Sequence, residues 1–312
     1  MNKKTLTGGF GIGNILFVAA LVIALPLRIY QYLGGVVEPA TGFFAKNNFS
    51  VYALYGVIAL FAVAAVVLGI INRKKLFYEI DSQKNIFLGV ASVLVALGII
   101  FDAAFCLDIP GTIDAIRSAT PEQPSTEITT NYVIVAQAAV SLLAALFFTV
   151  LGFVAFMGRT FASELRLLSL TPVLWAMLRM VARFMRTISY TRVSELLFEM
   201  FMLAFMIMFF MNFAQCNSKV NDEGNAWKLA SYGLPAALLG LLCFVPRAIM
   251  LVAGKGDVIY SGSALEFSDL TVALFAIATI LTKVTDLPPV KVAVTESAEK
   301  TTAENTEEKS EE

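Results

Sequence analysis

The densest group of charged residues in this chain lies near its middle and has a spacing that suits the binding of anions. Its members are Arg179, Arg183, Arg186, Arg192, Glu195 and Glu199. The first three arginines are spaced by four and three residues, and the two glutamates by four, so each set occupies one face of its own helix. An arginine fork binds carboxylates and phosphates through paired, charge-assisted hydrogen bonds. This group is therefore the first candidate for a ligand site.

The same spacing also predicts an ion-paired clasp between two helices. If the helices form an antiparallel hairpin whose turn centres on Ser189, residues equally far from Ser189 lie at the same depth. Arg179 then faces Glu199, and Arg183 faces Glu195. Because charges in a bilayer are costly unless they are paired, such a clasp explains the arginines without any ligand. Two glutamates can pair with only two of the four arginines, however. The alternative is therefore a clasp that also binds a carboxylate, a phosphate or a lipid headgroup.

Further charged residues fall inside the apolar runs, and the predicted topology places them all toward one side of the membrane. They are Arg28, Asp102, Arg247, Glu266 and Asp269. This asymmetry predicts a polar vestibule, open to the outer side, above an apolar floor. Glu266 and Asp269 start the last apolar run, where they would favour the positive end of the helix dipole or, as an alternative, bind a cation. For Arg28 and Arg247 we expect side chains that extend to the membrane surface.

Long runs without charge must position these residues. The chain is 58% hydrophobic and 15% charged, with a mean hydropathy of +0.75, whereas soluble proteins carry about 25% charged residues. A helix needs about 20 apolar residues to cross the hydrocarbon layer. The sequence therefore predicts an all-α, polytopic membrane bundle of about eight spans within residues 1–285. The spans are expected near residues 11–32, 50–71, 86–106, 132–156, 165–186, 194–215, 230–252 and 263–282.

Residues 286–312 form the second predicted region. From Val292 onward they carry seven Glu and two Lys but no aromatic residue. Such a segment cannot bury enough apolar surface to fold, so a disordered acidic tail is expected.

Basic residues in the short loops set the predicted orientation. Most of them fall on one side if eight spans alternate: Lys3, Lys4, Arg73, Lys74, Lys75, Lys84, Arg159, Lys219 and Lys228. The positive-inside rule assigns that side to the cytoplasm, with both termini there and the bundle in a plasma or inner membrane. The loop of residues 107–131 then lies on the outer side, as does the arginine group, which breaks the rule.

The absence of histidine and the small number of cysteines limit the kinds of metal site and catalytic site that the chain can form. Histidine is absent, which removes imidazole zinc ligands, histidine-ligated haem and a Ser-His-Asp triad. Cys106, Cys216 and Cys243 are far apart in or near apolar runs, which indicates reduced, packed thiols rather than a metal site or a disulfide framework. We therefore expect no metal, no other cofactor and no nucleic acid partner, and a function other than catalysis.

Three functions fit these features. The first is a small-solute transporter or permease, with an anionic small molecule held by the arginines as the candidate substrate. The second is a non-catalytic sensor or accessory subunit that binds a lipid headgroup or a protein partner on its outer side. The third, an enzyme acting on a membrane lipid, would use Asp102, Glu199 or Glu266 as acid or base. We favour transport, and in each case membrane lipids surround the helices.

Overall fold

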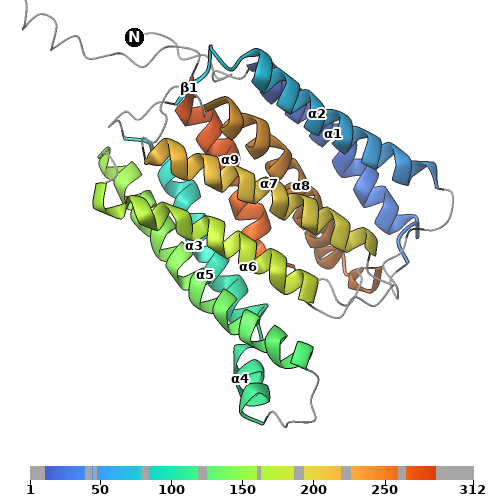
Figure 1. Cartoon of the computed structure of the whole chain (residues 1–312). Coiled ribbons are helices and arrows are strands. Elements are labelled where there is room, and N and C mark those ends of the chain that lie inside the picture. Colours follow the sequence, from blue (N-terminus) through green and yellow to red (C-terminus); the bar gives the residue numbers. More distant parts are fainter. Residues whose placement is uncertain are drawn as a thin grey trace, which may run out of the picture.

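The computed structural model describes residues 11–38, 44, 48–78, 84–118, 125–159, 163–185, 193–218, 226–258 and 265–285. Within these residues the chain is an all-α bundle, which confirms the predicted fold class (Figure 1). The α-helices are α1 (Gly11–Leu33), α2 (Phe49–Ile71), α3 (Ile86–Phe105), α4 (Ile109–Arg117), α5 (Ser125–Met157), α6 (Thr171–Met185), α7 (Val193–Asn217), α8 (Ala226–Val252) and α9 (Phe267–Lys283). Shorter elements are the 3-10 helices η1 (Ser163–Leu170) and η2 (Gly256–Val258) and the strands β1 (Phe77–Tyr78) and β2 (Val284–Thr285). The acidic tail predicted for residues 286–312 lies outside the described residues.

Seven helices in the described part are long and apolar enough to cross a membrane: α1, α2, α3, α5, α6 taken with the end of η1, α7 and α8. The chain is therefore a multi-pass membrane protein. The eighth predicted span corresponds to α9, whose 17 residues make it shorter than these seven. Even so, α9 belongs to the interior of the bundle, because it packs against α3 and α8 and most of its residues are buried.

The segment between α3 and α5 differs from the predicted loop of residues 107–131. It contains the short helix α4, and α5 already begins at Ser125 rather than near residue 132. Asp108 starts α4, because its Oδ1 accepts a hydrogen bond of 3.1 Å from the backbone N–H of Gly111. A search for long apolar runs misses α4, since it has nine residues and buries none of them.

α8 is the centre of the bundle. It contacts α1, α2, α7 and α9, and most of its residues are buried. In Figure 1, α1 and α2 form a hairpin on one edge of the bundle, whereas α3, α5 and α6 lie on the other side. β1 pairs with β2 in antiparallel register, Phe77 opposite Thr285 and Tyr78 opposite Val284. This pairing joins the end of α9 to the segment that follows α2.

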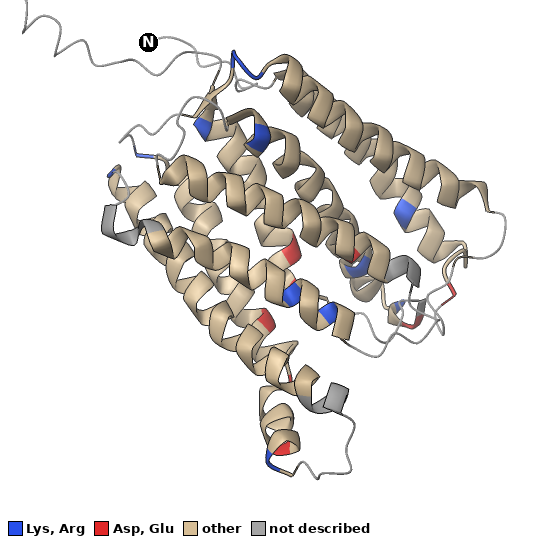
Figure 2. Ribbon diagram, in the orientation of Figure 1, with Lys and Arg blue, Asp and Glu red and all other residues tan. Residues whose placement is uncertain are grey.

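The two halves of the bundle differ in charge. Figure 2 shows Lys and Arg in both halves, whereas the Asp and Glu residues drawn in red lie only in the half opposite the end where α2 and α9 finish. Between the ends lies a core of fully buried rings, several of them packed edge to face: Phe147, Phe148, Phe209, Phe210, Phe213 and Phe275. Phe209 follows Glu199 on α7 by about 15 Å along the helix axis. An apolar floor therefore lies beneath the charged residues, as the sequence predicts.

Two glycines let α9 approach its neighbours closely. A Cβ at Gly240 of α8 would lie 2.8 Å from the backbone oxygen of Asp269, and one at Gly98 of α3 would lie 2.6 Å from Thr271 Oγ1. Without a hydrophobic force between helices in lipid, such small residues allow the close packing that holds the helices together. They fix the first turns of α9 between α3 and α8.

Replacing Gly240 by valine should lower the free energy of unfolding by about 1 to 3 kcal/mol, because the new side chain meets backbone that cannot move aside. Thermal unfolding of the purified protein in detergent measures this loss. The matched control is Gly56→Val on α2, where an added Cβ meets nothing within 4 Å. Equal shifts in the two variants would show that α8 and α9 do not cross at Gly240.

Candidate functional site

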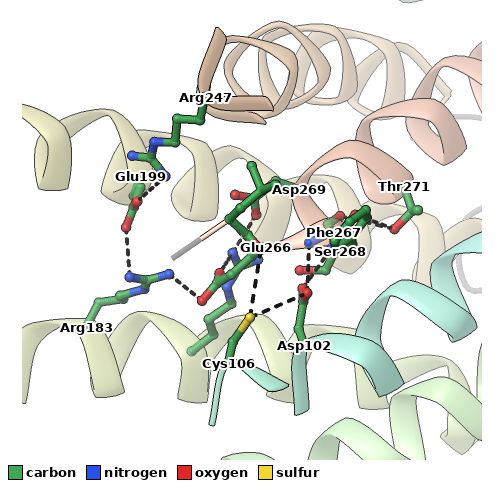
Figure 3. Close-up of polar contacts among 12 residues, drawn as sticks. Asp102, Cys106, Arg183, Glu199, Arg247, Glu266, Phe267, Ser268, Asp269 and Thr271 are labelled. Atoms are coloured by element: carbon green, nitrogen blue, oxygen red, sulfur yellow. Dashed lines mark hydrogen bonds and ion pairs between the residues drawn. The ribbon is translucent and has the colours of Figure 1, made fainter. Parts of the chain in front are cut away.

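A buried network of ion pairs joins four helices in the carboxylate-rich half of the bundle (Figure 3). The network consists of Arg179, Arg183, Glu199, Arg247, Glu266 and Asp269. Arg183 is its centre, since Nη1 lies 3.1 Å from Glu199 Oε2 and Nη2 lies 2.5 Å from Glu266 Oε1. Glu199 Oε1 also pairs with Arg247 Nη1 at 3.0 Å. Arg179 Nη2 pairs with Glu266 Oε2 and, at 2.5 Å, with Asp269 Oδ1.

Each of the four helices supplies part of this network. α6 contributes the first two arginines, four residues apart on its buried face, while α7 contributes Glu199 and α8 contributes Arg247. Glu266 and Asp269 belong to the start of α9. Every one of these side chains is at most 9% exposed, so the expected open vestibule is instead a closed, charged interior. Buried charges are stable only when opposite charges and hydrogen bonds surround them, which makes the four helices depend on one another.

Asp102 of α3 caps α9 from outside that helix. Its Oδ1 accepts a hydrogen bond of 2.7 Å from the backbone N–H of Phe267, and its Oδ2 accepts one of 2.8 Å from Ser268. Glu266 is the N-cap residue of α9 but makes no side-chain cap hydrogen bond itself. The carboxylate predicted for the helix dipole is thus supplied by a neighbouring helix, and Glu266 and Asp269 pair with arginines instead.

The predicted pairing between α6 and α7 differs from the observed one. Glu199 pairs with Arg183, one turn along α6 from the predicted partner Arg179. Arg179 turns toward α9, whose two carboxylates both contact it. A hairpin of two helices does not include α9, whose carboxylates compete for Arg179.

Three residues of the predicted group are not part of this description. Arg186 and Arg192 lie outside the described residues, as does the side chain of Glu195. The predicted pair between Arg183 and Glu195 therefore stays a prediction. Among the described residues, three arginines of the network face four carboxylates once Asp102 is included, so the excess of positive charge counted from the sequence is not present there.

Arg28 and Arg247 are buried rather than extended to the membrane surface, which corrects the expectation for both. Arg247 is 2% exposed and joins the network through Glu199. Arg28 is 3% exposed, donates to Gln31 Oε1 at 2.9 Å, and lies 4.9 Å from the ring centre of Phe198. Facing the bundle, both arginines find acceptors, and Arg28 also finds aromatic rings, which lipid does not offer.

A small pocket lies beside the network, between α3, α5, α6 and α9. Its polar walls are Asp102, Gln137, Ser141, Arg179, Glu266 and Ser268. Its volume is about 10 Å³, which is room for about one water molecule. Trp175 closes one side, and its ring centre lies 5.5 Å from the guanidinium carbon of Arg179. Gln137, Ser141 and Trp175 carry no motif in the sequence, and only the packing of α5 and α6 brings them here.

Cys106 also lines this pocket, immediately after α3. Burial, together with the carboxylates of Asp102 and Glu266, raises the pKa of its thiol to about 11, so the thiol is neutral at pH 7. Cys216 and Cys243 are buried, and none of the three cysteines forms a disulfide. Within the described residues, no group of three or more Cys, Asp or Glu side chains could hold a metal ion.

Replacing Asp102 by alanine should lower the free energy of unfolding by about 2 kcal/mol or more, because two buried N–H groups of α9 lose their acceptor. Thermal unfolding in detergent checks the loss. Asp108→Ala is the control, since Asp108 caps the exposed helix α4 and should cost about 1 kcal/mol or less. If both variants lose the same stability, the cap on α9 is not a structural requirement.

Comparison of the chain with protein-family models, with curated proteins and with solved structures finds no match. The residues of the site provide a closed network of paired charges and, beside it, a small polar pocket.

Proposed function

We propose that this multi-pass membrane protein transports a small polar solute, and that the ion-pair network is its outer gate. The observation that carries the proposal is the chain of buried ion pairs that links α6, α7, α8 and α9 in one half of the bundle. Ionisable residues within a membrane domain are costly and are most often retained for function. In this proposal the network holds the outer side closed.

The arrangement of the network suits a gate. Glu199 is shared by Arg183 and Arg247, and Glu266 is shared by Arg183 and Arg179, so one arginine can leave while the carboxylate keeps another partner. Pairs that can exchange partners provide two discrete arrangements, which alternating access requires. α8, which carries Arg247, also contains two prolines, and prolines permit bending within a membrane helix.

The charge of the transported solute is not set by the arginines alone. The network and Asp102 together hold three arginines and four carboxylates among the described residues, a balance that gives no preference for an anion. We therefore propose a polar solute rather than the anionic one expected from the sequence.

A non-catalytic accessory or sensor protein is the second candidate. The observation in its favour is that the pocket beside the network holds only about one water molecule, while the charges themselves are tightly paired. In this alternative the network is a permanent clasp and never opens.

Opening of the gate can be followed at Cys243, which is 4% exposed and precedes Arg247 by one turn of α8. In a Cys106→Ser background, Arg183→Gln should make Cys243 react with a maleimide about tenfold faster or more. The reason is that Arg183 holds both Glu199 and Glu266, and a shift of about 1.4 kcal/mol in the closed–open equilibrium already changes it tenfold. Mass spectrometry of the purified protein in detergent measures the rate.

Cys216 supplies the internal control, because it is 3% exposed and lies near the far end of α7. A gate that opens on one side leaves Cys216 protected, whereas faster reaction of both thiols would mean general loosening and would contradict a gate. Arg117→Gln is the matched control variant, since Arg117 and its partner Asp114 are each 78% exposed. If Cys243 stays protected in a folded Arg183→Gln protein, the permanent clasp is the better account.

The proposed orientation places the network on the outer side and both termini in the cytoplasm of a plasma or inner membrane, because exposed basic residues such as Arg73, Lys74 and Lys75 lie at the opposite end. On intact cells, a membrane-impermeant maleimide should therefore label Ser118→Cys but not Lys74→Cys. Permeabilised cells should show both labels, since both positions are exposed. The reverse pattern on intact cells would invert the orientation and make the network an inner gate.

A further inference from the structure

Arg179 Nη1 is a buried donor of the network that has no hydrogen-bond partner among the described residues. Both ion pairs of Arg179 use Nη2, whereas Nη1 is buried and makes no hydrogen bond to any described residue. Arg179 is 3% exposed and lines the small pocket between α3, α5, α6 and α9. A buried donor without an acceptor is unfavourable, so this nitrogen favours an occupant that can accept a hydrogen bond.

The charges around the pocket restrict what that occupant can be. Besides Arg179, the charged side chains in the wall are Asp102 and Glu266. An anion near Arg179 Nη1 would also meet these two carboxylates, and a cation near the carboxylates would meet Arg179. Since the low dielectric strengthens both repulsions, an uncharged occupant fits best.

The remaining polar walls suit a group that both donates and accepts. The hydroxyl of Ser141 donates to the backbone oxygen of Gln137 at 2.7 Å, so its own oxygen can still accept a hydrogen bond. The side-chain amide of Gln137 can do either, as can the hydroxyl of Ser268. The volume of about 10 Å³ has room for about one water molecule, so a slightly larger polar group enters only where side chains of the wall move aside.

From this geometry we infer that the pocket is a binding site for a neutral hydrogen-bonding group, namely a single amide or hydroxyl of a small solute. The inference rests on the proposed transport function in that the solute would be the cargo, and it names the chemical class of that cargo. Glu266 connects the two sites, because it lines the pocket and also pairs with Arg179 and Arg183.

Cys106 lines the pocket and reports on its occupancy. The test measures the rate at which a small methanethiosulfonate modifies Cys106 in purified Cys216→Ser, Cys243→Ser protein at fixed pH and ionic strength. Formamide and formate are probes of nearly the same shape, one neutral and one anionic. A ligand of three heavy atoms binds no tighter than about millimolar, so each is used at about 100 mM. Formamide should slow the modification by about threefold or more, and formate should not.

Two serine variants show whether the protection arises in the pocket. Ser268→Ala removes a hydroxyl from the wall and should abolish most of the protection by formamide. Ser50→Ala removes a buried hydroxyl from the start of α2, which does not line this pocket, and should leave the protection intact. Protection by formate that equals or exceeds that by formamide would overturn the inference in favour of an anion site. Protection by neither probe would overturn it as well, leaving a pocket that holds water alone.

The result is separable from the fate of the gate. If formamide does not selectively protect Cys106 but Cys243 becomes reactive in the Arg183→Gln protein, the proposed transport stands without this binding site. Selective protection of Cys106 by formamide with a buried Cys243 identifies a neutral binding site in a protein that does not open at the network.

Discussion

The need to compensate buried charge governs this structure. Seven helices can be placed in a membrane on hydropathy alone, but their faces carry arginines and carboxylates that lipid cannot stabilise. Once those side chains turn inward they need partners, and in the ion-pair network every partner belongs to another helix, which fixes which helices are neighbours and at what depth. Arg183 illustrates the point, since its two partners come from α7 and α9. The apolar rings below add packing but little directional information.

How far the sequence predicts this result depends on the range of the interaction. Apolar runs locate the helices, and the gathering of the charged side chains in one half of the bundle follows from simple alternation along the chain. The partners of Arg179 do not, because Glu266 lies 87 residues away and Asp269 lies 90 residues away. The predicted partner of Glu199 was on the right helix but one turn away from the observed one, because α6 packs against more helices than α7 alone. The sequence identifies Asp102 as a charged residue inside an apolar run. Its role as a helix cap follows only from the position of α9 beside α3.

The network and the pocket are two parts of one interior rather than separate sites. Arg179 and Glu266 belong to both, so an occupant that accepts from Arg179 Nη1 changes the environment of the pairs made by Nη2. Thermodynamic linkage then works in both directions: whatever rearranges the pairs changes affinity in the pocket by the same free energy. Packing transmits the effect, because Gly98 and Gly240 keep the first turns of α9 too close to α3 and α8 to move alone.

The small β-pair at the opposite end has a mechanical consequence. β2 follows α9 directly and is hydrogen-bonded to β1, so α9 is held at its C-terminal end by backbone and at its N-terminal end by ion pairs. Because α9 is held at both ends, it cannot shift along its own axis without breaking one of these attachments. α9 can still tilt about its C-terminal end, which β2 holds, when the ion pairs at its N-terminal end break. If α9 moves while β1 and β2 stay paired, its charged end is therefore displaced most, together with the turns of α3 and α8 that pack against it.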